Sequence, residues 1–122
     1  MKDFRDLEVW KKAHELTLAI YKCTENFPKH ELFGLTSQMR RCSASIAANI
    51  AEGCGRSNNG DFHRFLQNAM GSAVELDYHV LLARDLGYLD TADAILAPRV
   101  VAVKQMLSKL SRKVAIDRFQ RP

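Results

Sequence analysis

Residues 35–55 read LTSQMRRCSASIAANIAEGCG, and this stretch decides the fold. Its apolar side chains recur at helical spacing, in steps of four, three, four and four: Leu35, Met39, Cys42, Ile46 and Ile50. The other faces consist largely of alanine and serine, whose small side chains let neighbouring backbones approach closely. The stretch therefore predicts a long helix that packs on more than one side and ends at the glycines around position 54.

Three more helical segments surround this one. With this one included, apolar residues recur every three or four positions in four segments, at about residues 6–27, 32–53, 60–86 and 91–118. Period-two runs typical of strands are scarce. Pro28 ends the first segment, Ser57 or a neighbouring asparagine caps the third, and Gly87 ends it. Pro98 lies either in the first turn of the fourth helix, which then begins near Ala97, or at a kink.

Short connections between long helices make sequential helices antiparallel neighbours. The fold class predicted is therefore all-α: an up-down-up-down antiparallel four-helix bundle, in one domain spanning residues 1–122. The 122 residues, 47% of them hydrophobic, suffice for one ordinary core and no second domain.

The hydropathy and the cysteine count indicate the cellular compartment of the protein. No apolar run approaches the roughly 20 residues that span a bilayer, and the charged start MKDFRD lacks the apolar region of a secretory signal. The three cysteines include no CxxC pair and suggest no disulfide framework. We therefore expect a cytoplasmic protein that does not contact a membrane.

The second and third helices carry more apolar and small surface than one bundle core needs. On the third, a second apolar stripe that includes Leu66 and Val74 runs beside the main one, and on the second Ala48 lies among small residues. Soluble monomers rarely leave so much apolar surface exposed. We therefore expect a homo-oligomer, with Ala48, Leu66 and Val74 at its interface.

Positive charge is concentrated at the C-terminal end of a chain whose net charge is +4. From residue 99 onward there are seven basic residues and one acid, Asp117, a balance of +6, which leaves −2 for the first 98 residues. The seven basic residues are Arg99, Lys104, Lys109, Arg112, Lys113, Arg118 and Arg121. Such an excess forms either a solvated helix face or a surface that binds phosphate groups.

The phosphate-binding interpretation predicts sequence-independent binding of DNA or RNA, because phosphate contacts require only positive donors. The candidate residues come from three helices and the turn before the third: Arg40, Arg41, Arg56, Arg64, Lys109, Arg112 and Lys113. The alternative for Arg40 and Arg41 is an ion pair with Glu52, Glu75 or Asp77, inside one subunit or between subunits. No aromatic residues interleave with these charges, so base stacking has little support.

No set of residues predicts catalysis or a metal centre. A di-iron bundle needs Glu-x-x-His pairs, which the chain lacks, and Glu75 and His79, four positions apart, are interpreted as surface or partly buried residues. Cys23 and Cys42 fall on apolar stripes and are expected in the core, whereas Cys54 lies in a glycine turn where it could be exposed. Since no acid, base, nucleophile or ligand set converges, we expect a non-enzyme with no cofactor and no metal.

Several motifs occur together and in a fixed order. They are FRDLEVW at 4–10, GLTSQMRR at 34–41, SIAANIAEG at 45–53, GRS at 55–57, the run Phe62 to Leu66, and LARDLGYL at 82–89. In this combination the chain resembles the four-helix bundle family of 23S ribosomal RNA intervening-sequence proteins. The resemblance covers about Phe4 to Leu89, and the last helix matches only in character, with Pro98 departing from the usual smooth helix.

The resemblance implies a four-helix bundle that assembles as a ring-like homopentamer. The family is similar to the accessory variability protein of diversity-generating retroelements, a basic pentamer that binds nucleic acid and a reverse transcriptase. The polar positions matching the family pattern are Gln38, Arg40, Arg41, Asn49, Glu52 and Arg56. We interpret them mainly as residues that specify assembly, which adds Gln38, Asn49 and Glu52 to the candidate oligomer interface.

Two functions are compatible with these observations. The first is a non-enzymatic oligomeric scaffold whose basic surface binds nucleic acid without reading its sequence. The second is a protein–protein interaction module that binds a helical partner through its apolar stripes and needs no nucleic acid.

Overall fold

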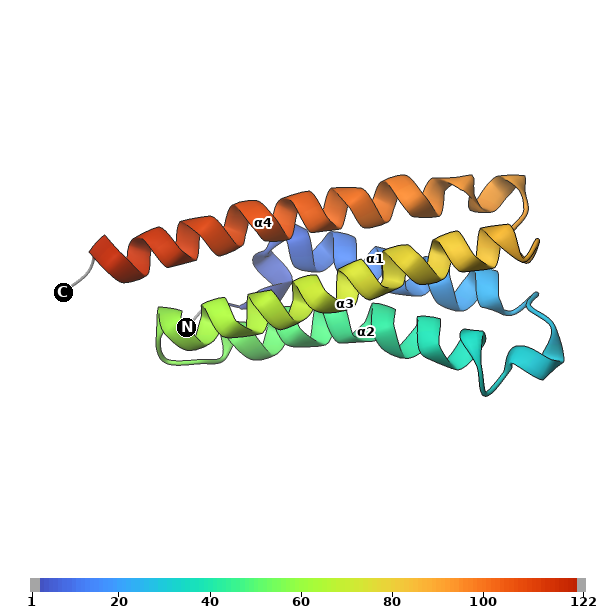
Figure 1. Cartoon of the computed structure of the whole chain (residues 1–122). Coiled ribbons are helices and arrows are strands. Elements are labelled where there is room, and N and C mark those ends of the chain that lie inside the picture. Colours follow the sequence, from blue (N-terminus) through green and yellow to red (C-terminus); the bar gives the residue numbers. More distant parts are fainter. Residues whose placement is uncertain (1–2, 121–122) are drawn as a thin grey trace.

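A computed structural model describes the backbone of residues 3–120 and the side chains of residues 3–117. It contains four long helices: α1 (Glu8–Thr24), α2 (Leu35–Cys54), α3 (Asn59–Asp85) and α4 (Leu96–Gln120). The chain reverses direction at each connection, so successive helices lie side by side and antiparallel (Figure 1). The predicted all-α bundle of four antiparallel helices is confirmed. None of the helices in the described part of the chain is both long enough and apolar enough to cross a membrane.

Three short 3-10 helices precede α1, α2 and α4 along the chain. They are η1 (Phe4–Asp6), η2 (Lys29–Glu31) and η3 (Thr91–Ile95). α1, α2 and α4 begin two to five residues later than the predicted starts at 6, 32 and 91, because η1 and η3 occupy the first predicted residues of two of them and residues 32–34 form a turn before α2. Pro98 lies in the first turn of α4, which begins at Leu96, so the first of the two alternatives for this proline is correct.

The turns at the two ends of α3 carry the predicted capping residues. The backbone N–H of Asp61 donates to Asn58 Oδ1 over 2.8 Å, which satisfies a free donor at the start of the helix. At the other end Gly87 has φ of +78°, a left-handed conformation that glycine adopts without steric cost. There the backbone N–H of Tyr88 donates to the carbonyl of Ala83, and that of Gly87 to Arg84, a Schellman motif.

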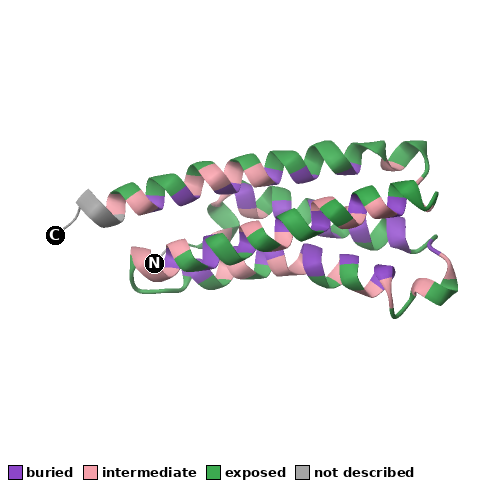
Figure 2. Ribbon diagram, in the orientation of Figure 1, coloured by how far each residue is buried: buried purple, intermediate pink, exposed green. Residues whose placement is uncertain are grey.

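The core lies along the inward faces of the four helices, where Figure 2 shows the buried residues in stripes. Its largest fully buried apolar side chains come from all four helices: Leu16, Ile20, Met39, Ile46, Ile50, Leu66, Leu76, Leu96, Val100, Val103 and Leu107. Small residues bring α2 and α3 together, and at Gly53 the packing leaves no room for a side chain. A Cβ atom at that position would lie 2.9 Å from Phe62 Cδ1 and 3.0 Å from Phe65 Cβ.

Two sequence-based expectations are wrong about burial. Leu66, expected at an oligomer interface, is 0% exposed within the single chain, because the apolar face of α3 is wide enough to pack on several neighbours at once. Cys54, considered a turn residue that could be exposed, is buried, because α2 continues through Gly53 and ends at Cys54. Cys23 and Cys42 are buried in the core as expected.

Candidate nucleic-acid interface

Three cations of α4 form the simplest part of the candidate site. Lys109, Arg112 and Lys113 are all exposed, and on a helix they fall within about 100° of one another around the axis. Within the described residues none of the three has an acidic partner at ion-pair distance. Lys104, five residues earlier, is different, because its Nζ lies 3.0 Å from Asp77 Oδ2 on α3. In the C-terminal half of α4 the free positive charge therefore begins at Lys109.

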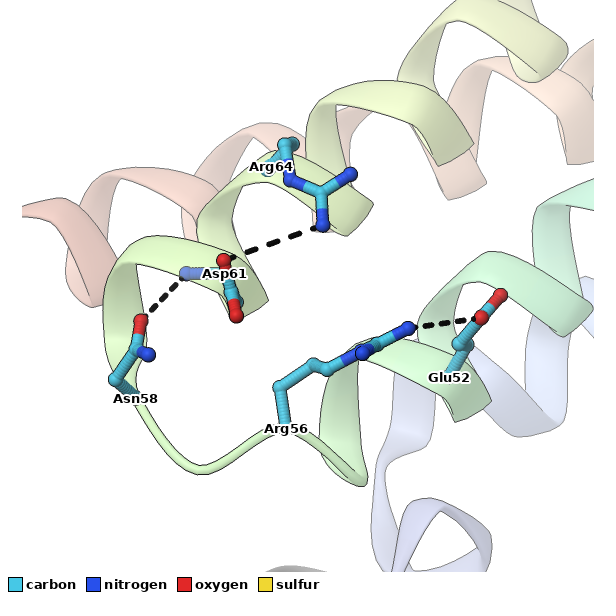
Figure 3. Close-up of polar contacts among 5 residues, drawn as sticks. All are labelled: Glu52, Arg56, Asn58, Asp61 and Arg64. Atoms are coloured by element: carbon cyan, nitrogen blue, oxygen red, sulfur yellow. Dashed lines mark hydrogen bonds and ion pairs between the residues drawn. The ribbon is translucent and has the colours of Figure 1, made fainter.

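Two more arginines lie near the connection between α2 and α3, Arg56 in the turn and Arg64 on α3, as Figure 3 shows. Arg56 pairs with Glu52 (Nη2 to Oε1, 3.1 Å), and Arg64 with Asp61 (Nη2 to Oδ1, 3.9 Å). Their guanidinium carbons lie 4.7 and 4.5 Å from the centroid of the Phe65 ring, so one buried aromatic ring orients both cations. All four charged groups are exposed enough for water to screen the pairs, and such pairs are weak, so a phosphate can compete for either arginine.

The α2–α3 turn and the C-terminal half of α4 meet at one end of the bundle. A cleft of about 270 Å³ lies between them, and its lining includes Arg56 and Asn58 from the turn and Lys113 and one acid, Asp117, from α4. We call the five residues Arg56, Arg64, Lys109, Arg112 and Lys113 the basic end. The fold thus brings Lys113 of α4 to the same cleft as Arg56 of the turn, although the two are far apart in the sequence. The side chain of Arg118 and the whole of Arg121 lie outside the described residues.

Arg40 does not belong to this surface. Its Nε donates to Thr24 Oγ1 over 2.9 Å, and its guanidinium lies 5.0 Å from the centroid of the Tyr21 ring, so it joins α2 to the end of α1. It lies about 20 Å along α2 from the turn, given 1.5 Å per residue. Among the seven candidate residues, Arg40 is therefore separate from the group at the α2–α3 turn and α4.

Arg41 is exposed on the outer face of α2, away from the cleft. The alternative role for Arg40 and Arg41, ion pairing with Glu52, Glu75 or Asp77, does not occur inside the described part of one chain. Glu52 pairs with Arg56 and Asp77 with Lys104 instead. Pairing between subunits stays a prediction.

The candidate interface residues on α2 fall mostly on its outer face. Gln38, Ala48 and Glu52 are exposed, and Asn49 is half-buried. The Asn49 side-chain amide donates to the Ser45 carbonyl over 2.8 Å and to its hydroxyl over 3.0 Å. The side of α2 that faces away from the core is thus polar, apart from Ala48.

The exposed apolar surface predicted on α3 lies toward its C-terminal end. Val74, Tyr78 and Leu81 are 50%, 59% and 42% exposed, and they border a groove of about 610 Å³ against the start of α4. Asp90 and Asp93, from the connection that leads into α4, also line this groove. Of the two α3 residues assigned to an interface, Val74 is therefore available at the surface and Leu66 is not.

The thiols are poorly suited to nucleophilic chemistry. Burial, with smaller contributions from nearby charges, raises the pKa of Cys23 to about 12. Burial also raises the pKa of Cys42, and the nearby Glu75 carboxylate raises it further. Both thiols are therefore protonated at neutral pH, whereas a nucleophile needs the thiolate.

The expectation that no ligand set converges is wrong at one place. One ligand atom each of Cys42, Glu75 and His79 lie within 4.8 Å of one another at the contact between α2 and α3. Sequence reasoning considered Glu75 and His79 only as a pair on one helix and assigned Cys42 to the core. The missing information was which residue of α2 faces them, and that depends on how the two helices pack.

Comparison with known proteins agrees with this architecture. The model of the family described as 23S rRNA-intervening sequence protein matches residues 5–109, which extends past Leu89 into α4. A solved structure from Bacteroides thetaiotaomicron, described as a protein with unknown function from the S23 ribosomal protein family, has 24% identity and a TM-score of 0.76. That alignment covers 85% of this chain and 95% of the other, and at this identity it shows the fold alone. No curated protein matches the chain. Because the family model spans 105 of the 122 residues, the chain belongs to the 23S rRNA-intervening sequence protein family.

Proposed function

We propose that this protein is a non-enzymatic, homo-oligomeric scaffold that binds nucleic acid through its basic end without reading base sequence. One observation carries the proposal: Lys109, Arg112 and Lys113 are exposed without acidic partners among the described residues, beside a cleft that Lys113 shares with Arg56. Unpaired cations on one surface attract the phosphate backbone of any duplex.

The lack of sequence preference follows from the chemistry of the basic end. Lysine and arginine side chains at an exposed surface contact phosphates, which are the same at every base step. The aromatic ring nearest to these cations, Phe65, is only 6% exposed, so it cannot stack on an unpaired base. Binding should therefore be driven by released counterions and should weaken steeply with salt.

Assembly would strengthen this binding by repeating the basic end in each subunit. The exposed apolar side chains beside the α3–α4 groove supply a reason for association, because water contact with Val74, Tyr78 and Leu81 is unfavourable. A homopentamer is the assembly that the family resemblance implies. Linked copies bind a long polyanion more tightly than a single copy does.

Fluorescence anisotropy with labelled duplexes of two unrelated sequences tests the proposal. We expect similar affinity for both and a linear fall of log K with log salt concentration, with a slope of about 0.9 for each phosphate that the protein neutralises. The triple variant K109Q/R112Q/K113Q should bind more weakly, and its slope should be smaller by up to about 2.7, the share of three phosphates. A control variant, K11Q/K22Q/K29Q, makes the same change in net charge at exposed positions elsewhere. Absence of binding at low salt, or equal weakening in both variants, would contradict the proposal.

The second candidate function is a protein-interaction module. The observation that favours it is the groove of about 610 Å³ bordered by Val74, Tyr78 and Leu81, which has the size and apolar character to accept side chains from a partner helix. A partner retained in pull-downs by the wild type and lost with Leu81→Glu, in the presence of nuclease, would support it. Loss of the same partner on nuclease treatment would favour the nucleic-acid scaffold.

A further inference from the structure

The contact between α2 and α3 contains a compact set of three potential metal ligands. Cys42 comes from the core face of α2, while Glu75 and His79 lie one turn apart on α3. Residues four positions apart project from the same side of a helix, so both α3 side chains reach the same region. Their ligand atoms and that of Cys42 all lie within 4.8 Å of one another.

His79 supplies a second, independent observation. Its Nδ1 is buried, and among the buried side-chain nitrogen and oxygen atoms of the described residues it is the one without a hydrogen-bond partner. A buried polar atom without a partner costs about 1–3 kcal/mol, so native proteins normally satisfy such atoms with a protein group, a water or an ion. The imidazole that contributes one atom to the ligand set therefore also has a buried nitrogen whose hydrogen-bonding capacity is unused.

We propose that Cys42, Glu75 and His79 bind one divalent transition-metal ion, with Zn²⁺ as the preferred ion. A thiolate and an imidazole are ligands that Zn²⁺ and Co²⁺ favour, whereas Mg²⁺ and Ca²⁺ require mostly oxygen ligands. This inference does not rest on nucleic-acid binding, since none of the three residues belongs to the basic end.

The geometry needs only a small adjustment. Around tetrahedral zinc, bond lengths of about 2.0–2.3 Å place ligand atoms roughly 3.3–3.7 Å apart. A set within 4.8 Å must therefore close by about 1 Å. Glu75 is exposed, so its carboxylate has room to move toward the buried Cys42 and the half-buried His79.

A polar groove gives the ion a route to the site. The groove has a volume of about 440 Å³, and its lining is entirely polar apart from Gly71: Ser45, Asn49, Gln67, Asn68, Ser72 and Glu75. Because Glu75 belongs both to this groove and to the ligand set, an ion entering from solvent meets a carboxylate first. Three protein ligands leave one tetrahedral position, which a water from the groove can occupy.

Binding exchanges a hydrogen bond for a metal–sulfur bond. In the structure Cys42 Sγ lies 2.8 Å from the carbonyl oxygen of Ser72, to which the thiol donates. When the metal binds, the thiol proton leaves to solvent and sulfur coordinates as thiolate, so one proton is released for each ion bound. The ion then links α2 to α3 within one chain.

Cobalt titration tests the site directly. Protein stripped with a chelator should bind one Co²⁺ per chain, with a thiolate-to-cobalt charge-transfer band in the near ultraviolet, and Zn²⁺ should displace the Co²⁺. Cys42→Ser should abolish the band, and His79→Gln should abolish stoichiometric binding. Two control variants should leave the charge-transfer band and the stoichiometry of binding unchanged. They are Cys23→Ser, which removes a different buried thiol, and His63→Gln, which removes another α3 imidazole.

Folding of the variants is checked by circular dichroism. If Cys42→Ser does not fold, His79→Gln and Glu75→Gln still test the site, because both positions are at least partly exposed. Zn²⁺ should also raise the Tm of the wild type, and His79→Gln should lose this rise. Failure of the wild type to bind one ion per chain, or a charge-transfer band that persists in Cys42→Ser, would overturn the proposal.

Discussion

Gly53 shows how one missing side chain fixes the distance between two helices. A Cβ atom there would lie 2.9 Å from the Phe62 ring and 3.0 Å from Phe65 Cβ, and both residues are buried, so neither can easily move away. We expect Gly53→Ala to lower the free energy of unfolding by about 1–3 kcal/mol, the usual result of overpacking. Urea denaturation measures it.

Gly71 provides the matched control for this prediction. It lies inside α3, where a Cβ atom would meet no other atom within 4 Å. Gly71→Ala should therefore raise the free energy of unfolding by about 0.5–1 kcal/mol, through helix propensity alone. If Gly53→Ala and Gly71→Ala changed the free energy of unfolding in the same direction, close packing at Gly53 would not explain the effect of Gly53→Ala.

Glu31 makes stability depend on pH. The backbone N–H of Leu35 donates to its Oε1 over 3.2 Å and the Tyr88 hydroxyl to its Oε2 over 2.9 Å, and these bonds hold the pKa of the Glu31 carboxyl below its ordinary value. A carboxyl whose pKa is lower in the folded state stabilises the protein above its unfolded pKa, and this contribution disappears as the pH falls through the folded pKa.

The variant Glu31→Gln keeps the size of the side chain and removes its charge. Its Tm should lie below that of the wild type near neutral pH, and the difference should shrink as the pH falls below the ordinary range of a glutamate carboxyl, because the charge is then lost. Thermal melts at neutral and at acidic pH measure this. Glu15→Gln, on the exposed face of α1, is the control, and a Tm gap that stays constant with pH would contradict the role given to the charge.

At the scale of the element, sequence periodicity located all four helices but not their first residues. The spacing of apolar residues depends on which side of a helix is buried, and a 3-10 turn placed just before a helix continues nearly the same pattern. For this reason the predicted fourth helix includes Thr91–Ile95, which form a 3-10 helix before α4. Capping residues were more informative, because Asn58 and Gly87 act through local backbone geometry that the sequence specifies directly.

The N-cap of α3 leads to a prediction about this helix. Asn58→Ala removes the acceptor for the Asp61 N–H and should lower the free energy of unfolding by about 1 kcal/mol. Asn58→Asp, which keeps an acceptor and adds a favourable negative charge at the helix start, should retain or increase stability. Chemical denaturation of both variants separates the cap from other effects. Equal destabilisation in the two would show that the side-chain acceptor is not what stabilises the turn.

At the scale of the whole molecule, the sequence identified the candidate cations but not their grouping. Lys109, Arg112 and Lys113 are close in sequence on one helix, so their proximity was predictable. The position of Arg56 beside Lys113 depends on α4 lying against the α2–α3 turn, and the separation of Arg40 depends on its contact with Tyr21. Likewise, Cys42 faces Glu75 only because of how α2 and α3 are rotated against each other.

Assembly and polyanion binding are linked in the proposed function, and one variant tests that link. Leu81→Glu places a charge in the apolar groove between α3 and α4 and should convert the oligomer to a monomer in light scattering. Since its basic end is intact, the monomer should still bind a short duplex with a similar salt slope but bind a long one more weakly than the oligomer does. Leu18→Glu, at a residue 56% exposed on α1, is the control and should stay oligomeric. A wild type that is monomeric at micromolar concentration would remove the reason to expect repeated basic ends, and the three α4 cations would then have to account for all binding.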